Sequence, residues 1–165
     1  GIVETVGPQG VLAKIGKSGE ELQENLMAYT AFLEKNPEYI SKTDQEQEFD
    51  LALAIAAIEV ALKRHAGYIS QEFNPVMGII PGTPIGRDLR RVKHVIAVGG
   101  IFTHRTPADK QFVLEQAFAN PGISLLPTGP QFIVDEQYLL YAVGVLGQKY
   151  SDACLNFARR QFRID

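Results

Sequence analysis

Residues 93–104 form a stretch whose residue types and spacing suggest a ligand site. A run rich in valine and isoleucine ends at the pair Gly99 and Gly100. Such a run predicts a strand buried on both faces, and two glycines at its end allow a sharp turn with no side chain to keep a ligand away. A helix is expected to begin near Pro107, with Thr106 as its cap. A nucleotide can lie on a strand, Gly-Gly turn and helix, although many α/β proteins turn on two glycines for steric reasons alone.

Other motifs of nucleotide binding and hydrolysis do not occur in the sequence. The residues after Gly99 lack the G-x-G-x-x-G spacing of dinucleotide sites, and neither a P-loop nor a G-x-S-x-G nucleophile elbow is found. The segment 82–88 could also face a phosphate, but its spacing is not diagnostic. No metal-ligand spacing relates the three histidines, which are His65, His94 and His104. The sequence therefore predicts no catalytic residue and no metal ligand.

The cysteine and two acids at turns are expected to have structural roles. Cys154 lies beside Leu155 in a predicted helix, where a buried and inert thiol is expected. Asp88 lies at a turn and Asp135 at a helix start, where capping is the usual role of aspartate. A single cysteine excludes an internal disulfide and fits a reducing compartment. We therefore expect a cytoplasmic location.

The composition is that of a globular domain. The 165 residues are 45% hydrophobic and 21% charged, and the net charge is −3. There is no basic stripe, so nucleic acid is not an expected partner. No apolar run approaches the ~20 residues that span a bilayer, so no membrane association is expected.

The first part of the chain predicts helices. A short helix should end at Gly7, and capping-box spacing recurs at Ser18 with Glu21 and at Thr43 with Glu46. The two longer helices should end at Asn36-Pro37 and at Gly67. Their expected core-facing residues are Leu22, Leu26, Tyr29 and Leu33 in the first, and Phe49, Leu53, Ile58 and Leu62 in the second.

The second part predicts strands that alternate with helices. The expected strands cover residues 73–80, 85–89, 92–98, 123–127 and 131–134, with a hairpin joining the first two. Helices are expected from Pro107, from Asp135 as a cap, and from Ser151 as a cap. This order indicates an α/β fold in which a helical subdomain, residues 1–72, precedes an α/β part, residues 73–165. Because the chain starts without methionine and only a few short strands are visible, we expect a fragment of a larger protein.

Several short motifs, taken in order, resemble one protein family, the MutL-like proteins associated with glutamate mutase. These proteins are unrelated to the DNA-repair proteins of the same name. The likeness runs from about Ile2 to the C-terminus. The motifs that carry it are residues 64–67 (Arg-His-Ala-Gly), 86–89 (Gly-Arg-Asp-Leu), 95–102 (Val-Ile-Ala-Val-Gly-Gly-Ile-Phe), 125–127 (Leu-Leu-Pro) and 135–146, which begins Asp-Glu-Gln-Tyr.

The resemblance implies an actin-like ATPase, of the superfamily that contains actin, heat-shock chaperones and sugar kinases and has the ribonuclease H-like fold. In that superfamily a strand ending in Gly-Gly, followed by a helix, forms the adenosine side of the nucleotide site in the second lobe. It therefore assigns Gly99 and Gly100 to the nucleotide pocket, with Ile101 and Thr103 adjacent. Val98 precedes the glycines, where the family pattern often has threonine.

The resemblance also implies a role and its limits. The family is linked to adenosylcobalamin-dependent mutases and aminomutases as a chaperone or reactivating factor that uses ATP with Mg²⁺. The two phosphate-binding hairpins of the superfamily do not occur in these residues, so this chain matches a C-terminal portion that alone should not hydrolyse ATP. A non-catalytic scaffold whose helices bind a mutase subunit remains the alternative, and an unrelated α/β enzyme is a third possibility.

Overall fold

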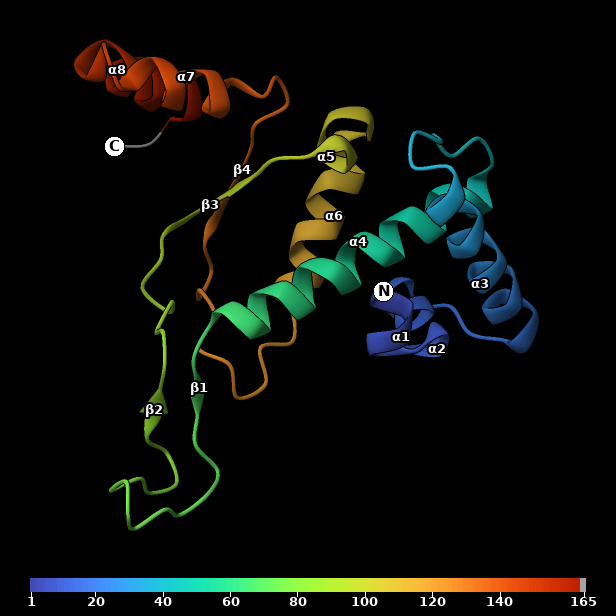
Figure 1. Cartoon of the computed structure of the whole chain (residues 1–165), viewed down its shortest axis with the longest axis horizontal. Helices are drawn as coiled ribbons and strands as arrows, with labels where there is room; N and C mark the ends of the chain where they lie inside the picture. The colour runs from blue at the N-terminus through green and yellow to red at the C-terminus, as the bar shows by residue number, and fades with distance from the viewer. Residues whose placement is uncertain (164–165) are drawn as a thin grey trace. The chain divides into compact units, whose positions relative to one another are not determined.

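The computed structural model describes residues 1–163 and shows a mixed α/β chain in which helices predominate (Figure 1). Two small two-stranded sheets accompany the helices. In chain order the elements are α1 (Ile2–Val6), α2 (Pro8–Leu12), a 3-10 turn (Ala13–Ile15), α3 (Glu20–Lys35), α4 (Asp44–His65), β1 (Tyr68–Ile69), β2 (Pro84–Ile85), β3 (His94–Ala97), α5 (Gly100–His104), α6 (Pro107–Phe118), β4 (Gln131–Val134), α7 (Leu139–Gly147) and α8 (Ser151–Phe162). None of these helices is long and apolar enough to cross a membrane.

The chain divides into two compact units. The first contains residues 1–89 and 111–126, and the second contains residues 90–110 and the described residues from 127 onward. Helix α6 begins in the second unit and continues in the first. The expected division into a helical subdomain (residues 1–72) and an α/β part (residues 73–165) concerns folding domains rather than compact units, and it stays a prediction.

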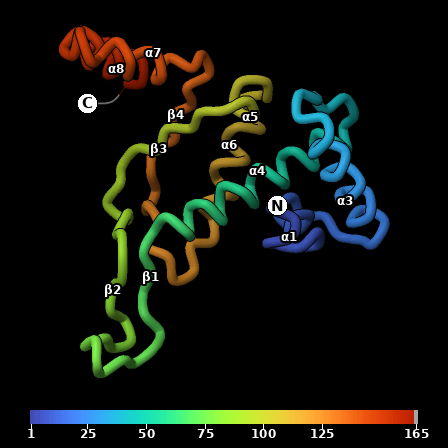
Figure 2. Tube along the Cα trace, viewed as in Figure 1, coloured from blue at the N-terminus to red at the C-terminus, as the bar shows by residue number. Residues whose placement is uncertain are grey.

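The helical part of the first unit is built around α2, α3 and α4. Leu26 and Tyr29 of α3 are buried, as the helical periodicity predicts, together with Phe49 of α4. The Tyr29 hydroxyl donates a hydrogen bond of 2.8 Å to Asp50 Oδ1. Burial, together with this bond, raises the pKa of Tyr29 above its usual value. The short α1 lies against α4, as the trace in Figure 2 also shows.

Of the two predicted capping boxes, the one at Thr43 forms and the one at Ser18 does not. Ser151 was also predicted as a cap, but it is the first residue of α8, and Tyr150 is the N-cap. Thr43 Oγ1 accepts from the Glu46 N–H, and Glu46 Oε2 accepts from the Thr43 N–H, so α4 begins at the predicted capping box. At α3 the N-cap is Gly19, without a side-chain bond, and Ser18 lies one residue outside. Because Gly19 adopts a φ of 129°, the chain turns into the helix at the glycine, and the Ser18 hydroxyl does not cap it.

The buried face of α4 differs from the prediction. Besides Phe49 it consists of Ala52, Ile55 and Ala56, with Glu59; the three other predicted core positions, Leu53, Ile58 and Leu62, stay partly exposed. Glu59 is 8% exposed, and its carboxylate accepts from Lys63 Nζ at 2.5 Å and also from Lys14 Nζ. A buried carboxylate needs such partners, so this pair of lysines explains how an acid fits on a core face.

The predicted hairpin of residues 73–80 with residues 85–89 does not form, and another segment pairs with β2. β1, at Tyr68–Ile69, pairs antiparallel with β2, whereas residues 73–80 form no strand and make one isolated bridge between Asn74 and Ile79. The side chains of this connecting loop include exposed apolar residues, with Val76 94% exposed. Apolar content alone made residues 73–80 look like a strand, although no neighbouring strand pairs with them.

In the second unit, β3 and β4 pair in parallel, and both were predicted as strands. Helices α7 and α8 pack together as a helical hairpin, with Cys154 partly buried near Gly147. The expected strand at residues 123–127 lies mainly in the first unit and is not a strand of either sheet. It makes an isolated bridge to Tyr68 and backbone hydrogen bonds to Gly67, Ile69 and Leu89. Leu125 and Leu126 are nevertheless buried, which accounts for their apolar character.

Candidate functional site

The carboxyl ends of β3 and β4 meet at one edge of their sheet. Register places Ala97 opposite Val134, and the Asp135 N–H donates to the Ala97 carbonyl at 2.9 Å. Each strand is followed by a turn at this edge, so the Gly-Gly pair and Asp135 both lie where the chain leaves the sheet. In parallel sheets ligands bind outside the carboxyl ends of the strands.

The Gly-Gly pair is the start of a helix. Gly99 has a φ of 137°, which side-chain-bearing residues rarely adopt, and Gly100 opens α5. The Phe102 N–H donates to the Gly99 carbonyl at 2.9 Å, and the Thr103 hydroxyl donates to the same oxygen at 3.3 Å. Gly99, Gly100, Ile101 and Thr103 therefore form one turn of chain.

That arrangement corrects one expectation and confirms another. A helix was expected only from Pro107, but α5 begins directly after Gly99. The expected helix α6 does begin at Pro107, and Thr106 caps it by accepting from the Asp109 N–H at 3.2 Å. Two successive helices thus follow β3, the first of only five residues.

Space is open on the backbone of both glycines. A Cβ built at Gly99 or at Gly100 would meet no atom within 4 Å. Gly99 is needed for its backbone conformation, whereas Gly100 has no such requirement. A flat ligand can approach this bare backbone, which is the property that the Gly-Gly motif was predicted to supply.

Asp135 accepts from the start of α7, as a capping aspartate does, although the N-cap residue is Tyr138 and not Asp135 as predicted. The residue is 2% exposed, and its two carboxylate oxygens accept from the backbone N–H groups of Leu139 and Leu140, at 2.9 Å each. Both oxygens are thus used to hold the start of α7 against the end of β4.

An ion pair between Lys110 and Glu136 near this edge of the sheet was not predicted. Lys110, in the first turn of α6, is 7% exposed, and its Nζ donates to Glu136 Oε1 at 2.5 Å. Glu136 follows directly after Asp135, so a cation from α6 is held next to the end of β4. The partners are 26 residues apart, and a lysine in a helix carries no sequence signal for such a contact.

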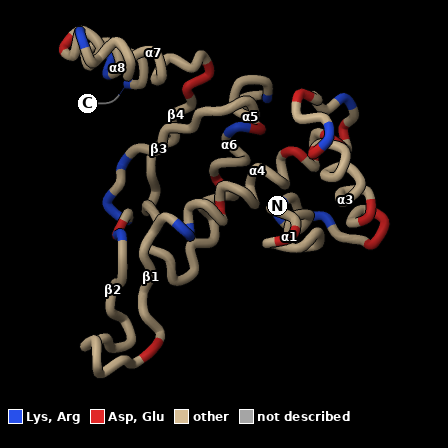
Figure 3. The backbone as a smooth tube through the Cα atoms, in the orientation of Figure 1, with Lys and Arg blue, Asp and Glu red and all other residues tan. Residues whose placement is uncertain are grey.

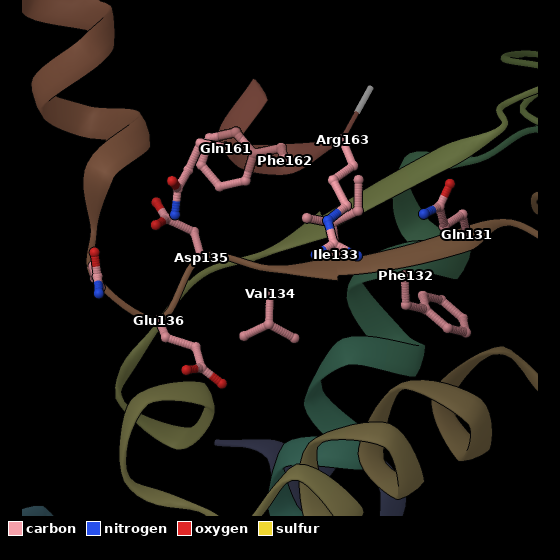
Figure 4. A pocket seen from close by; sticks show the side chains of 10 residues that line it. Gln131, Phe132, Ile133, Val134, Asp135, Glu136, Gln161, Phe162 and Arg163 are labelled. Atoms are coloured by element: carbon pink, nitrogen blue, oxygen red, sulfur yellow. The ribbon is translucent and has the colours of Figure 1, made fainter. Parts of the chain in front are cut away.

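A pocket of about 290 Å³ lies along β4 (Figure 4). Its walls are residues 131–137 and residues 161–163 at the end of α8. Figure 4 shows the Phe162 ring and the Arg163 side chain above the strand. The four predicted nucleotide-binding residues do not line it. Among residues 1–163 no group of three or more His, Cys, Asp or Glu side chains could hold a metal ion.

A family model described as MutL protein matches residues 1–162. The chain belongs to the MutL protein family. This confirms the family that the order of motifs indicates.

Among curated proteins, the MutL-family chain is similar to Protein MutL of Clostridium tetanomorphum, with 33% identity over 124 residues. That alignment covers 73% of this chain and 26% of the relative, so the chain spans about a quarter of the relative's length. No solved structure matches the chain. Membership of the MutL family tests neither the nucleotide role of Gly99, Gly100, Ile101 and Thr103 nor the actin-like fold, and both stay predictions.

Proposed function

We propose that this chain is the C-terminal part of an actin-like ATPase and contributes the adenosine side of its nucleotide site. The observation that carries the proposal is the convergence of Gly99 and Gly100 with the end of β4 at one edge of a parallel sheet. Membership of the MutL protein family, in which the resemblance places such an ATPase, supports it. Ile101 and Thr103 complete the same turn.

The residues present fit the nucleoside part of ATP. The space over the glycine backbone is open, so a planar base can lie against it without displacing a side chain. Bound ATP with Mg²⁺ supplies the phosphoanhydride that the longer protein would cleave. The residues of this chain hold the nucleoside only, and we expect the chain alone not to hydrolyse ATP.

The proposed partner is a subunit of an adenosylcobalamin-dependent mutase or aminomutase, in the cytoplasm. The protein would act on it as a chaperone or reactivating factor. This part of the proposal rests on the association of MutL-like proteins with glutamate mutase and on membership of the family.

The nucleotide assignment is tested by filling the space over the second glycine. In a full-length family member that carries this segment, Gly100→Phe should weaken ATP binding at least about tenfold, since the ring would occupy the place of the base. Isothermal titration calorimetry measures the affinity. The control is Gly144→Phe, because Gly144 in α7 also has open space around its Cβ position. Equal ATP affinity in the wild type and the folded Gly100→Phe protein would show that the glycines do not hold the base.

A non-catalytic scaffold is the second candidate function. An apolar groove among α1, α3 and α4 favours it, because such a groove is suited to protein binding rather than to chemistry. On this reading the Gly-Gly turn is vestigial. Capture of a mutase subunit by the 165-residue chain, to the same extent with and without ATP, would favour the scaffold over the ATPase.

A further inference from the structure

Three helices of the first unit enclose an apolar groove of about 680 Å³. Helix α1 forms one wall with residues 1–4, and α3 and α4 form the others. Met27 and Ala31 of α3 and Ala54 and Ala57 of α4 line it. Met27 is 55% exposed. Leu33 and Leu53 line the groove and also pack against the core cluster around Leu26 and Tyr29, so the groove borders the core. The four groove residues named above are not part of that cluster.

The charged side chains that line the groove are acidic. Its charged lining residues are Glu4 and Glu34, of which Glu4 pairs with the terminal ammonium of Gly1. Helical spacing places Glu24 on the same face of α3 as Met27 and Glu34, so carboxylates flank the apolar centre. Residues 1–50 contain ten Asp and Glu against four Lys, whereas the whole chain has 19 acidic and 16 basic residues. Figure 3 marks acidic positions in red at the start of α3 and at the start of α4.

The walls of the groove suit a helix better than an extended peptide. All three walls are helices, whose backbone groups are already bonded, so an extended peptide would bury N–H and C=O groups without partners. A helix satisfies its own backbone and needs only an apolar face. The alanines at the centre, Ala31, Ala54 and Ala57, allow its close approach. The groove residues of α3 run from Met27 to Glu34, about 12 Å of helix, which matches about two turns of a partner helix.

We propose that this groove binds an amphipathic helix of a partner protein, with apolar residues at i, i+3, i+4 and i+7 and with Lys or Arg on both flanks. The apolar face fills the groove, and the basic flanks meet Glu24 and Glu34. The groove belongs to the first compact unit, whereas the residues proposed to bind the nucleotide belong to the second.

The probe is a fluorescein-labelled peptide of about 16 residues with leucines at those positions and lysines on the flanks, titrated with the 165-residue chain. Fluorescence anisotropy should show saturable binding, and circular dichroism should show added helix on binding. Affinity should fall several-fold between about 50 mM and 300 mM salt, because exposed ion pairs are screened. A peptide with glutamates in place of the lysines should bind at least about fivefold more weakly.

Paired variants of α3 locate the binding surface. Ala31→Phe should fill the groove and weaken binding at least about tenfold. Ala28→Phe, on the exposed side of the same helix away from the groove, should leave affinity unchanged. Glu34→Lys should weaken binding at low salt, whereas Glu21→Lys, with the same charge change outside the groove, should not. Circular dichroism melting shows that each variant is folded.

Four results would overturn the proposal. The first is the absence of saturable binding by the lysine-flanked peptide. The second is equal affinity in folded Ala31→Phe and Ala28→Phe. The third is equal binding of a proline-interrupted peptide of the same composition, which cannot form the helix. Binding of a small apolar dye in place of the peptide would identify the groove as a small-ligand site and would likewise overturn it.

Discussion

At the scale of single residues, Gly67 is the glycine whose replacement should be most costly. A Cβ there would lie 2.2 Å from the Ile85 carbonyl oxygen and 2.7 Å from the Arg87 nitrogen, both backbone atoms. Gly67 also donates to the Arg87 carbonyl and accepts from the Leu125 N–H at 2.8 Å. Gly67→Ala should therefore lower the free energy of unfolding by about 3 kcal/mol, measured by urea denaturation.

Gly144→Ala is the matched control for Gly67→Ala. Gly144 lies within α7, and a Cβ there would meet no atom within 4 Å. Alanine in a helix is favoured over glycine, so this change should raise stability by about 0.5–1 kcal/mol. If Gly67→Ala were as stable as Gly144→Ala, the close approach of β2 to Gly67 would be wrong.

The glycines also show what sequence alone could not predict at this scale. Gly67 was predicted as a helix terminator, but α4 ends at His65 with Ala66 as its C-cap, and Gly67 allows the approach of a strand 18 residues away. A sequence shows that a glycine is present, whereas the atom that a Cβ would meet depends on long-range packing.

At the scale of elements, the capping box of α4 should be worth a measurable free energy. Thr43→Ala removes the side-chain oxygen that accepts from the Glu46 N–H and should cost about 1 kcal/mol of unfolding free energy. The backbone N–H groups of Lys42 and Thr43 lower the pKa of Glu46, so the contribution of the Glu46 carboxylate to the capping box is lost as the pH falls through that lowered value, whereas the Thr43 hydroxyl bond does not titrate.

Ser18→Ala is the control for Thr43→Ala, because both have capping-box spacing but only one caps. Ser18 is exposed and lies outside α3. Its replacement should change stability by less than about 0.5 kcal/mol in the same urea measurement. A loss at Ser18 equal to that at Thr43 would contradict the observed start of α3.

The helices were predictable because their signals are local. The cap at Thr43, the stop at Pro37 and the spacing of Leu26 and Tyr29 all act within a few residues. The strands were less predictable, because strand pairing needs a distant partner. β1 is only two residues long, and the apolar run 73–80 has no partner strand. β4 was found because it is a short apolar segment between two turns.

At the scale of the whole molecule, the candidate site could be predicted only in part. The Gly-Gly turn is local, and residues 99–103 stay together in the structure. The parallel pairing that places Asp135 at the same edge links positions more than 30 residues apart, and so does not follow from local pattern. The Lys110–Glu136 ion pair likewise joins residues far apart in the sequence and does not follow from local pattern.

The stability of the whole chain in acid should depend on one residue, Glu59. Burial alone would raise the pKa of Glu59, but the ammonium groups of Lys14 and Lys63 outweigh it and hold that pKa below its usual value. The folded pKa is thus below the unfolded one. The contribution of Glu59 is therefore complete above about pH 4.5 and is lost as the pH falls through the folded value.

Glu59→Gln should accordingly lower the free energy of unfolding by about 1–2 kcal/mol at pH 7, because two lysines lose their common carboxylate. Urea denaturation between pH 7 and pH 3.5 should show this difference constant down to about pH 5 and shrinking below it. The control is Glu38→Gln, an exposed position, whose effect should stay within about 0.5 kcal/mol. A difference between wild type and Glu59→Gln that grew on acidification would mean that the pKa of Glu59 is raised, and that the lysines do not stabilise its charge.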